Sequence, residues 1–149
     1  MEPKPLRTYV GEDEGDQVLM RGGSVVIKSN AGLSGRPAMG TQQVLRGVGI
    51  PIHRHFEMDE TFYVLEGSGT FILDDVRHPI ARGGSIFIRR LCWHGFENPD
   101  EELLLLWIMA PAGVEGMFRE LGTPPGALSV DRTKDEVNRI AGKYGTEFK

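Results

Sequence analysis

Residues 47–67, GVGIPIHRHFEMDETFYVLEG, carry two histidines and several carboxylates between two glycines. Side chains alternate between the faces of a β-strand, so His53 and His55, two residues apart, project to the same side. Glu60 lies five residues after His55, and in one unbroken strand it would point the opposite way. A turn or bulge through residues 56–59 would return its carboxylate to the two imidazoles. We therefore expect these three side chains to share one centre.

A second block, GGSIFIRRLCWHGFEN at residues 83–98, adds His94 from a strand further along the chain. Three imidazoles and one carboxylate can hold a divalent first-row metal ion and leave coordination positions open. We predict that His53, His55, Glu60 and His94 bind such an ion, with ligand atoms within roughly 2.0 to 2.3 Å of it. Ligands from three strands converge only in a closed or folded sheet. Iron, manganese, nickel and zinc all suit this ligand set, so the set does not identify the metal.

Four other polar side chains near these blocks have simpler interpretations. Glu57 and Asp59 are within reach of the site but are expected to be solvated loop carboxylates. Cys92 is expected to be a buried and unreactive thiol, because nothing marks its pKa as lowered. His78 is expected in an exposed turn.

The order of strands and turns predicts an all-β protein. Strands are expected in segments that are apolar or alternate in polarity: residues 18–28, 39–46, 61–66, 70–73, 76–82, 85–90 and 103–109. Residues 67–69, Gly-Ser-Gly, predict the tight turn of a hairpin. The 20 glycines and the repeated turns favour an antiparallel double-sheet barrel.

Short helices are expected after the last strand. One should span residues 112–121, and Thr133 with Glu136 has the spacing of a capping box at the start of another. The chain is therefore divided into an N-terminal arm (1–17), a barrel (18–111) and a C-terminal helical extension (112–149).

The spacing of the two blocks resembles that of the cupin superfamily. In the family's first motif, a glycine is followed by His-x-His, a glutamate and a second glycine, and Gly47, His53, His55, Glu60 and Gly67 meet every spacing. The likeness covers roughly residues 39–110. It implies a jelly-roll (cupin) barrel in which the three histidines and Glu60 bind the metal.

The family's second motif is matched less completely. Gly83, His94 and Asn98 have the expected spacing, whereas Arg89 and Leu91 occupy the usual places of a proline and a glycine. The loop before His94 is therefore expected to be unusual, while the spacing of the ligands is intact.

Residues 111–121, PAGVEGMFREL, together with the first block are similar to small single-domain cupins of the quercetin-dioxygenase-like type. In quercetin dioxygenases, the equivalent of Glu60 touches the metal and can take a proton from the substrate hydroxyl. The resemblance therefore implies that Glu60 is both ligand and catalytic base. It also implies a dioxygenase-like metalloenzyme that acts on a small organic molecule.

Other function classes stay open. A dioxygenase needs an apolar pocket, for which the candidate lining residues are Phe62, Phe71, Phe96, Trp107 and Met109. A sugar or keto-acid isomerase needs a basic cluster, for which the candidates are Arg46, Arg54, Arg89 and Arg90. A non-catalytic, metal-dependent small-molecule binding protein could use the same metal ligands.

Composition limits the partners and the compartment. The net charge of -4 argues against a nucleic-acid surface, which usually needs a basic face. A single cysteine fits a reducing cytoplasm, and the N-terminal residues lack the apolar region of a signal peptide. The longest apolar run, Leu103–Ala110, is far short of the roughly 20 residues that span a bilayer. We expect a cytoplasmic protein that binds neither nucleic acid nor membrane.

The segment LLLLWIM at residues 103–109 is apolar on both faces of a strand. Such a strand is covered on both sides. One face should line the barrel, and the other should pack against a helix or a second subunit. Single-domain members of the cupin superfamily are commonly homodimers, so we expect a homodimer.

Overall fold

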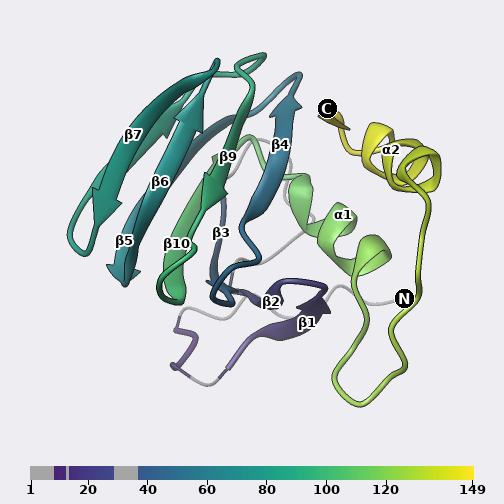
Figure 1. Cartoon of the computed structure of the whole chain (residues 1–149). Coiled ribbons are helices and arrows are strands. Elements are labelled where there is room, and N and C mark those ends of the chain that lie inside the picture. The colour runs from purple at the N-terminus through teal and green to yellow at the C-terminus, as the bar shows by residue number, and fades with distance from the viewer. Residues whose placement is uncertain (1–8, 13, 29–36) are drawn as a thin grey trace.

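The computed structural model describes residues 9–12, 14–28 and 37–149. These residues form two antiparallel sheets (Figure 1). In spatial order, the six-stranded sheet consists of β1 (Asp16–Met20), β2 (Gly23–Ile27), β3 (Ala38–Val44), β10 (Leu103–Ala110), β5 (Asp59–Glu66) and β8 (Ser85–Ile88). The five-stranded sheet consists of β11 (Thr146–Phe148), β4 (Ile50–His55), β9 (His94–Glu97), β6 (Ser68–Leu73) and β7 (Val76–Ala81). The predicted antiparallel double-sheet fold is confirmed.

The core lies between the sheets, and β10 shows how the sequence produces it. Alternate residues of this strand are fully buried (Leu103, Leu105, Trp107 and Met109), whereas those between them are only partly buried. The strand pairs with β3 on one side and β5 on the other. Its inward face therefore lines the barrel, as predicted.

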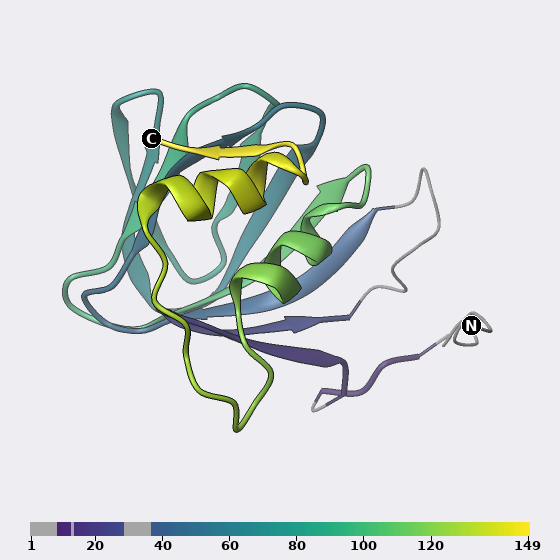
Figure 2. The same ribbon diagram turned by 90° about the vertical axis from the view of Figure 1, so that its right-hand side faces the viewer.

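Two short helices follow β10: α1 (Val114–Leu121) and α2 (Lys134–Gly142). Thr133 and Glu136 form the predicted capping box at the start of α2. Both helices lie on the same side of the two sheets (Figure 2), with α1 against α2 and β1 and with α2 beside β11. Phe118 of α1 packs 5.5 Å from Trp107, centroid to centroid, so α1 covers the inward side of β10. None of the helices in the described part of the chain has the length and apolarity to cross a membrane.

The first predicted strand, residues 18–28, is wrong in one respect, because it is two strands. β1 and β2 form a hairpin that turns at Arg21 and Gly22. Gly23 has a φ of 146°, and a Cβ there would lie 2.2 Å from the carbonyl oxygen of Gln43. The run of apolar residues hid this turn. Most of the predicted arm, residues 1–8 and 13, lies outside the described residues, as do residues 29–36 of the following loop.

The predicted hairpin through residues 67–69 is also wrong. β5 belongs to the six-stranded sheet and β6 to the five-stranded sheet, so the chain crosses between sheets at Gly67. Gly67 has a φ of 87°, and a Cβ would lie 2.1 Å from the carbonyl oxygen of Glu102. A glycine with positive φ serves a crossing as well as a tight turn, and the sequence does not distinguish the two.

Candidate metal centre

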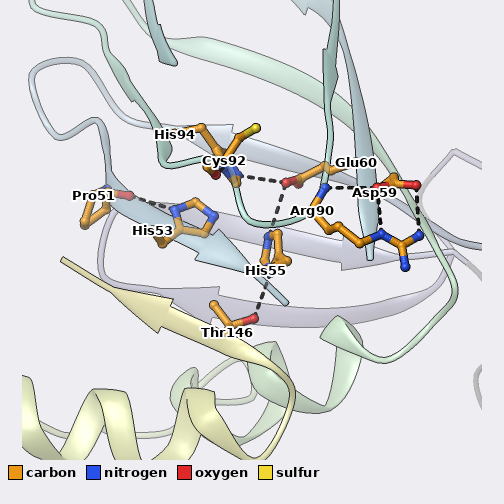
Figure 3. Close-up of polar contacts among 9 residues, drawn as sticks. All are labelled: Pro51, His53, His55, Asp59, Glu60, Arg90, Cys92, His94 and Thr146. Atoms are coloured by element: carbon orange, nitrogen blue, oxygen red, sulfur yellow. Dashed lines mark hydrogen bonds and ion pairs between the residues drawn. The ribbon is translucent and has the colours of Figure 1, made fainter. Parts of the chain in front are cut away.

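The four predicted ligands come from three strands and meet between the two sheets (Figure 3). His53 and His55 lie on β4, and His53 pairs directly with His94 of β9 in the same sheet. Glu60 faces them from β5 in the other sheet. The chain changes sheets between β4 and β5, and this crossing returns the Glu60 carboxylate to the imidazoles.

The side chains are buried and close together. Their relative exposures are 7% for His53, 2% for His55, 3% for Glu60 and 0% for His94. One ligand atom from each residue lies within 4.8 Å of the other three. The Oε2 atom of Glu60 is 3.0 Å from His94 Nε2 and 3.2 Å from His55 Nε2. Four potential ligand atoms are thus gathered around one point.

Hydrogen bonds on the far side of each ring orient the histidines. His53 Nδ1 lies 2.8 Å from the carbonyl oxygen of Pro51, and His94 Nδ1 lies 3.0 Å from that of Cys92. A carbonyl oxygen only accepts, so both Nδ1 atoms donate, which leaves the two Nε2 atoms as the possible ligand atoms. His55 Nδ1 lies 2.8 Å from the hydroxyl of Thr146 on β11. Such contacts fix the ring orientation of metal-binding histidines.

This arrangement fits a cation. Among the described residues, His55 Nε2 and Glu60 Oε1 are buried without a hydrogen-bond partner. Polar atoms without partners are costly in a buried site, and a metal ion bound by the imidazoles and the carboxylate would satisfy them together. The cluster can therefore hold a metal ion, and its donor atoms do not identify which one.

The environment sets the protonation of the cluster at neutral pH. Burial, together with the neighbouring rings of His94 and His55, lowers the pKa of His53 to about 3. Burial alone would raise the pKa of Glu60, but its contacts with His55 and His94 outweigh burial and bring it to about 2. His53 is thus neutral and Glu60 ionised at pH 7, the states in which they bind metals.

A cavity of about 880 Å³ opens from the cluster. His53, His55 and Glu60 form part of its wall. Of the five predicted lining residues, Phe62 and Met109 line the cavity, while Phe71, Phe96 and Trp107 are buried in the core behind the wall. Their apolar character could not reveal which of them face the open space. Other apolar residues of the wall come from α1, α2 and β11: Val114, Met117, Phe118, Leu121, Val137 and Phe148.

The arginines at the cavity differ from those predicted. The described residues of the wall include none of Arg46, Arg54, Arg89 and Arg90. Arg54 instead pairs with Glu147, and Arg90 pairs with Asp59 at the surface.

The arginines that do line the cavity are Arg21, in the β1–β2 turn, and Arg132, before α2. Sequence reasoning missed both because they lie far from the two motifs. No local signal marks them.

β11 is the main element of the site that sequence reasoning missed. It pairs with β4 and places Thr146 opposite His55 and Phe148 opposite His53. The Phe148 ring stacks on His53 at a centroid distance of 5.3 Å. Residues 146–148 are too few to show a period in the sequence, so nothing local predicted the strand.

The loop before His94 keeps its shape without the usual glycine. Leu91 has a φ of 72°, the left-handed conformation that favours glycine, and its N–H donates to the carbonyl oxygen of His55 at 2.7 Å. Asn98 is buried and holds the loop between β3 and β4 through bonds to the backbone of Val44, Leu45 and Gly49. This asparagine supports the frame and does not join the cluster.

The remaining polar side chains stay outside the cluster. Glu57 and Asp59 are exposed, as predicted. His78 is exposed but lies in β7 and not in a turn. Cys92 is only partly buried, although burial and the nearby Asp74 raise the pKa of its thiol, which fits the expectation of low reactivity.

Comparison with known sequences gives a family match for the motif region. Residues 40–109 match the Cupin_2 family model, described as a cupin domain. An uncharacterized protein of Methanocaldococcus jannaschii is 34% identical over 47 residues, which cover 32% of this chain and 38% of that protein. The match thus spans less than half of that relative's length.

Solved structures with the same fold have diverse descriptions. An RmlC-like cupin from Shewanella frigidimarina has a TM-score of 0.62 at 20% identity, with 71% of this chain and 92% of that chain covered. A putative sugar phosphate isomerase from Acidithiobacillus ferrooxidans has a TM-score of 0.51 at 28% identity, with 62% of each chain covered. Pac13 from Streptomyces, described as a nucleoside dehydratase, has a TM-score of 0.60 at 16% identity, with 71% and 83% covered.

Proposed function

We propose that the chain is a metal-dependent, dioxygenase-like enzyme acting on a small organic molecule, and the match of residues 40–109 to the Cupin_2 family model supports this proposal. The observation that carries this proposal is the position of the ligand cluster in the wall of the 880 Å³ cavity. Pockets of about 300–1,000 Å³ suit drug-sized molecules. A substrate in the cavity would lie beside the residues that would hold the metal ion.

Glu60 is the residue to which we assign proton transfer. It lines the cavity and belongs to the cluster. A carboxylate with a pKa of about 2 is a weak base, so it matches only a strongly acidified substrate proton. A divalent metal ion supplies that acidity when it binds a substrate hydroxyl. Glu60 would then receive the proton within the buried site, while the three histidines would hold the metal.

The character of the wall favours a substrate with an apolar body. The lining includes the apolar side chains of Phe62, Met109, Ile50 and Phe148. A sugar presents hydroxyl groups on every side and needs many polar partners. Arg54 and Arg90, two of the arginines expected to serve a phosphorylated sugar, are engaged in ion pairs instead. The apolar lining favours oxygenation of an apolar molecule, while Arg21 and Arg132 in the wall make sugar isomerisation the second candidate function.

Oxygen consumption tests the proposal. Protein purified without a nickel column is analysed for its metal and then screened for oxygen uptake with flavonols, diketones and catechols. A dioxygenase incorporates both atoms of one O2 molecule into product, so isotopically labelled O2 should give a mass gain of two labelled oxygens.

The same screen distinguishes the other function classes. Turnover without oxygen uptake would replace the proposal with isomerase or dehydratase chemistry. Binding of small molecules to the metal-loaded protein, without turnover in any of these classes, would favour a binding protein.

A further inference from the structure

Gln42 is a polar residue in a row of β3 that is otherwise small or apolar. Ala38, Gly40 and Val44 share its face of the strand and are buried. Its cross-strand neighbours are Val25 on β2 and Leu105 on β10, both fully buried. The side chain of Gln42 is therefore directed into the barrel between two aliphatic groups.

The amide of Gln42 lines the cavity and has no hydrogen-bond partner among the residues that the structure describes. It is not one of the buried polar atoms, so it remains accessible from the cavity. Gln43, the next residue of β3, also borders the cavity, but its amide already bonds the Glu102 carboxylate at 2.7 Å. An amide held on an apolar wall without a partner loses free energy relative to a leucine there.

Gln42 and Glu60 stand apart on the same inner face of the six-stranded sheet. Glu60 is in register with Met109 of β10, and Gln42 is in register with Leu105. The two register positions are four residues apart along β10, and β3 and β5 lie on opposite sides of that strand. The Cα atoms of Gln42 and Glu60 are therefore about 16 Å apart. Both side chains extend inward, which shortens the span between their polar ends. A molecule of moderate length can therefore touch both.

We propose that Gln42 binds the second polar end of the substrate, a hydroxyl group, while the first end occupies the metal cluster. A hydroxyl both donates and accepts, and so matches the carbonyl and NH2 groups of the amide. The ligand class is an apolar molecule with an oxygen donor at one end and a hydroxyl at the other. This inference rests on the proposed function for the metal-bound end and adds the recognition of the far end.

Alkyl hydroxamic acids test the inference by direct binding, because the hydroxamate head binds zinc and the chain enters the cavity. Two series of increasing chain length are compared on zinc-loaded protein by calorimetry, one ending in a hydroxyl and one in a methyl group. We expect the wild type to prefer the hydroxyl ending by about tenfold at one chain length, the effect of one hydrogen bond.

Variants at position 42 test whether Gln42 causes the preference for the hydroxyl ending. Gln42→Leu should abolish it, while Gln17→Leu, the same change at an exposed position of β1 outside the cavity wall, should leave it intact. Gln42→Asn withdraws the amide by one methylene, so the preference should return with a chain one carbon longer. This shift is not expected from a general loss of stability.

The outcomes separate this inference from the proposed function. Absence of a hydroxyl preference at every length, failure of the hydroxamates to bind, or an unchanged preference in Gln42→Leu would overturn the role of Gln42. A Gln42-dependent preference in a protein that turns over no substrate would support that role and remove the enzymatic proposal.

Discussion

Glu60 is the carboxylate of the cluster, beside three histidines. With a pKa of about 2 it stays ionised at neutral pH, and Gln has nearly the same shape without the charge or the ability to accept a proton. We expect Glu60→Gln to lower turnover roughly 100-fold while most of the metal is retained. The measurements are turnover and metal content.

Glu57→Gln is the matched control, since it makes the same change in an exposed carboxylate of the preceding loop. It should behave like the wild type. Full turnover of Glu60→Gln with bound metal would show that the carboxylate is only a ligand.

His53 makes the stability of the metal-free protein depend on pH. Its pKa is about 3 in the folded protein and about 6.5 in an unfolded chain. Between these values the unfolded chain binds more protons, so the free energy of unfolding falls as the pH falls from 6.5. The slope from one such group approaches about 1.4 kcal/mol per pH unit. Urea unfolding of metal-free protein between pH 7 and pH 4 measures it.

Two variants test whether His53 causes this dependence of the free energy of unfolding on pH. His53→Gln should flatten it, whereas His78→Gln, at an exposed position on β7, should not. If stability were the same at pH 7 and pH 4.5 in the wild type, the account of His53 as a buried neutral imidazole would be wrong.

At the scale of elements, β11 supports the metal cluster from the end of the described chain. The Thr146 hydroxyl is the partner of His55 Nδ1. Removing such a partner typically lowers metal affinity 10–100-fold. We expect this loss for Thr146→Val, measured by competition with a chromophoric chelator.

Thr146→Ser keeps the hydroxyl and should retain most of the affinity. An affinity of Thr146→Val within twofold of the wild type would mean that His55 is oriented by packing alone.

The sequence predicted elements where spacing or period is local. The two motifs placed all four cluster residues because ligand geometry demands specific types at specific intervals, and the capping box at Thr133 located the start of α2. The hairpin of β1 and β2, the sheet crossing at Gly67, and β11 were missed. Each of these features depends on a contact with backbone that is distant in the sequence, as between Gly67 and Glu102. The residues next to the feature in the sequence do not indicate that contact.

The same limit applies to the cavity. Phe62 and Phe96 are both inward aromatic residues in ring contact, yet only Phe62 borders the open space. Gln42 lies at the wall because β3 runs between β2 and β10, and Arg132 lies there because the segment before α2 borders the cavity. Sequence motifs predicted the chemistry of the metal-bound end, and the fold was needed to find the residues at the far end.

At the scale of the molecule, the outer face of the six-stranded sheet has the character of an interface. Two rows cross β3, β10, β5 and β8 without a charged side chain: Met39, Ile108, Thr61 and Phe87, then Thr41, Leu106, Tyr63 and Ser85. Met39, Tyr63 and Phe87 are 40%, 43% and 75% exposed. Apolar faces of this extent mark association sites. We propose that a second copy of the chain covers this face.

Sedimentation tests the dimer. We expect about 33 kDa, twice the 16.5 kDa of one chain, at tens of micromolar, roughly, where an interface of ordinary size holds. Tyr63→Glu should give a monomer, whereas Val76→Glu, exposed on β7 of the other sheet, should leave the dimer intact. A wild-type monomer at that concentration would remove the proposal.

The measurement closest to the central claim is the metal content of protein purified without added metal or a nickel column, by elemental analysis of wild type and His94→Ala. His94 is fully buried within the cluster, so its removal takes away a ligand that no neighbour replaces. The account predicts about one divalent transition metal ion per wild-type chain and its loss in folded His94→Ala. A wild-type protein that binds no metal even when metal is supplied, or a His94→Ala protein that keeps a full equivalent, would contradict it.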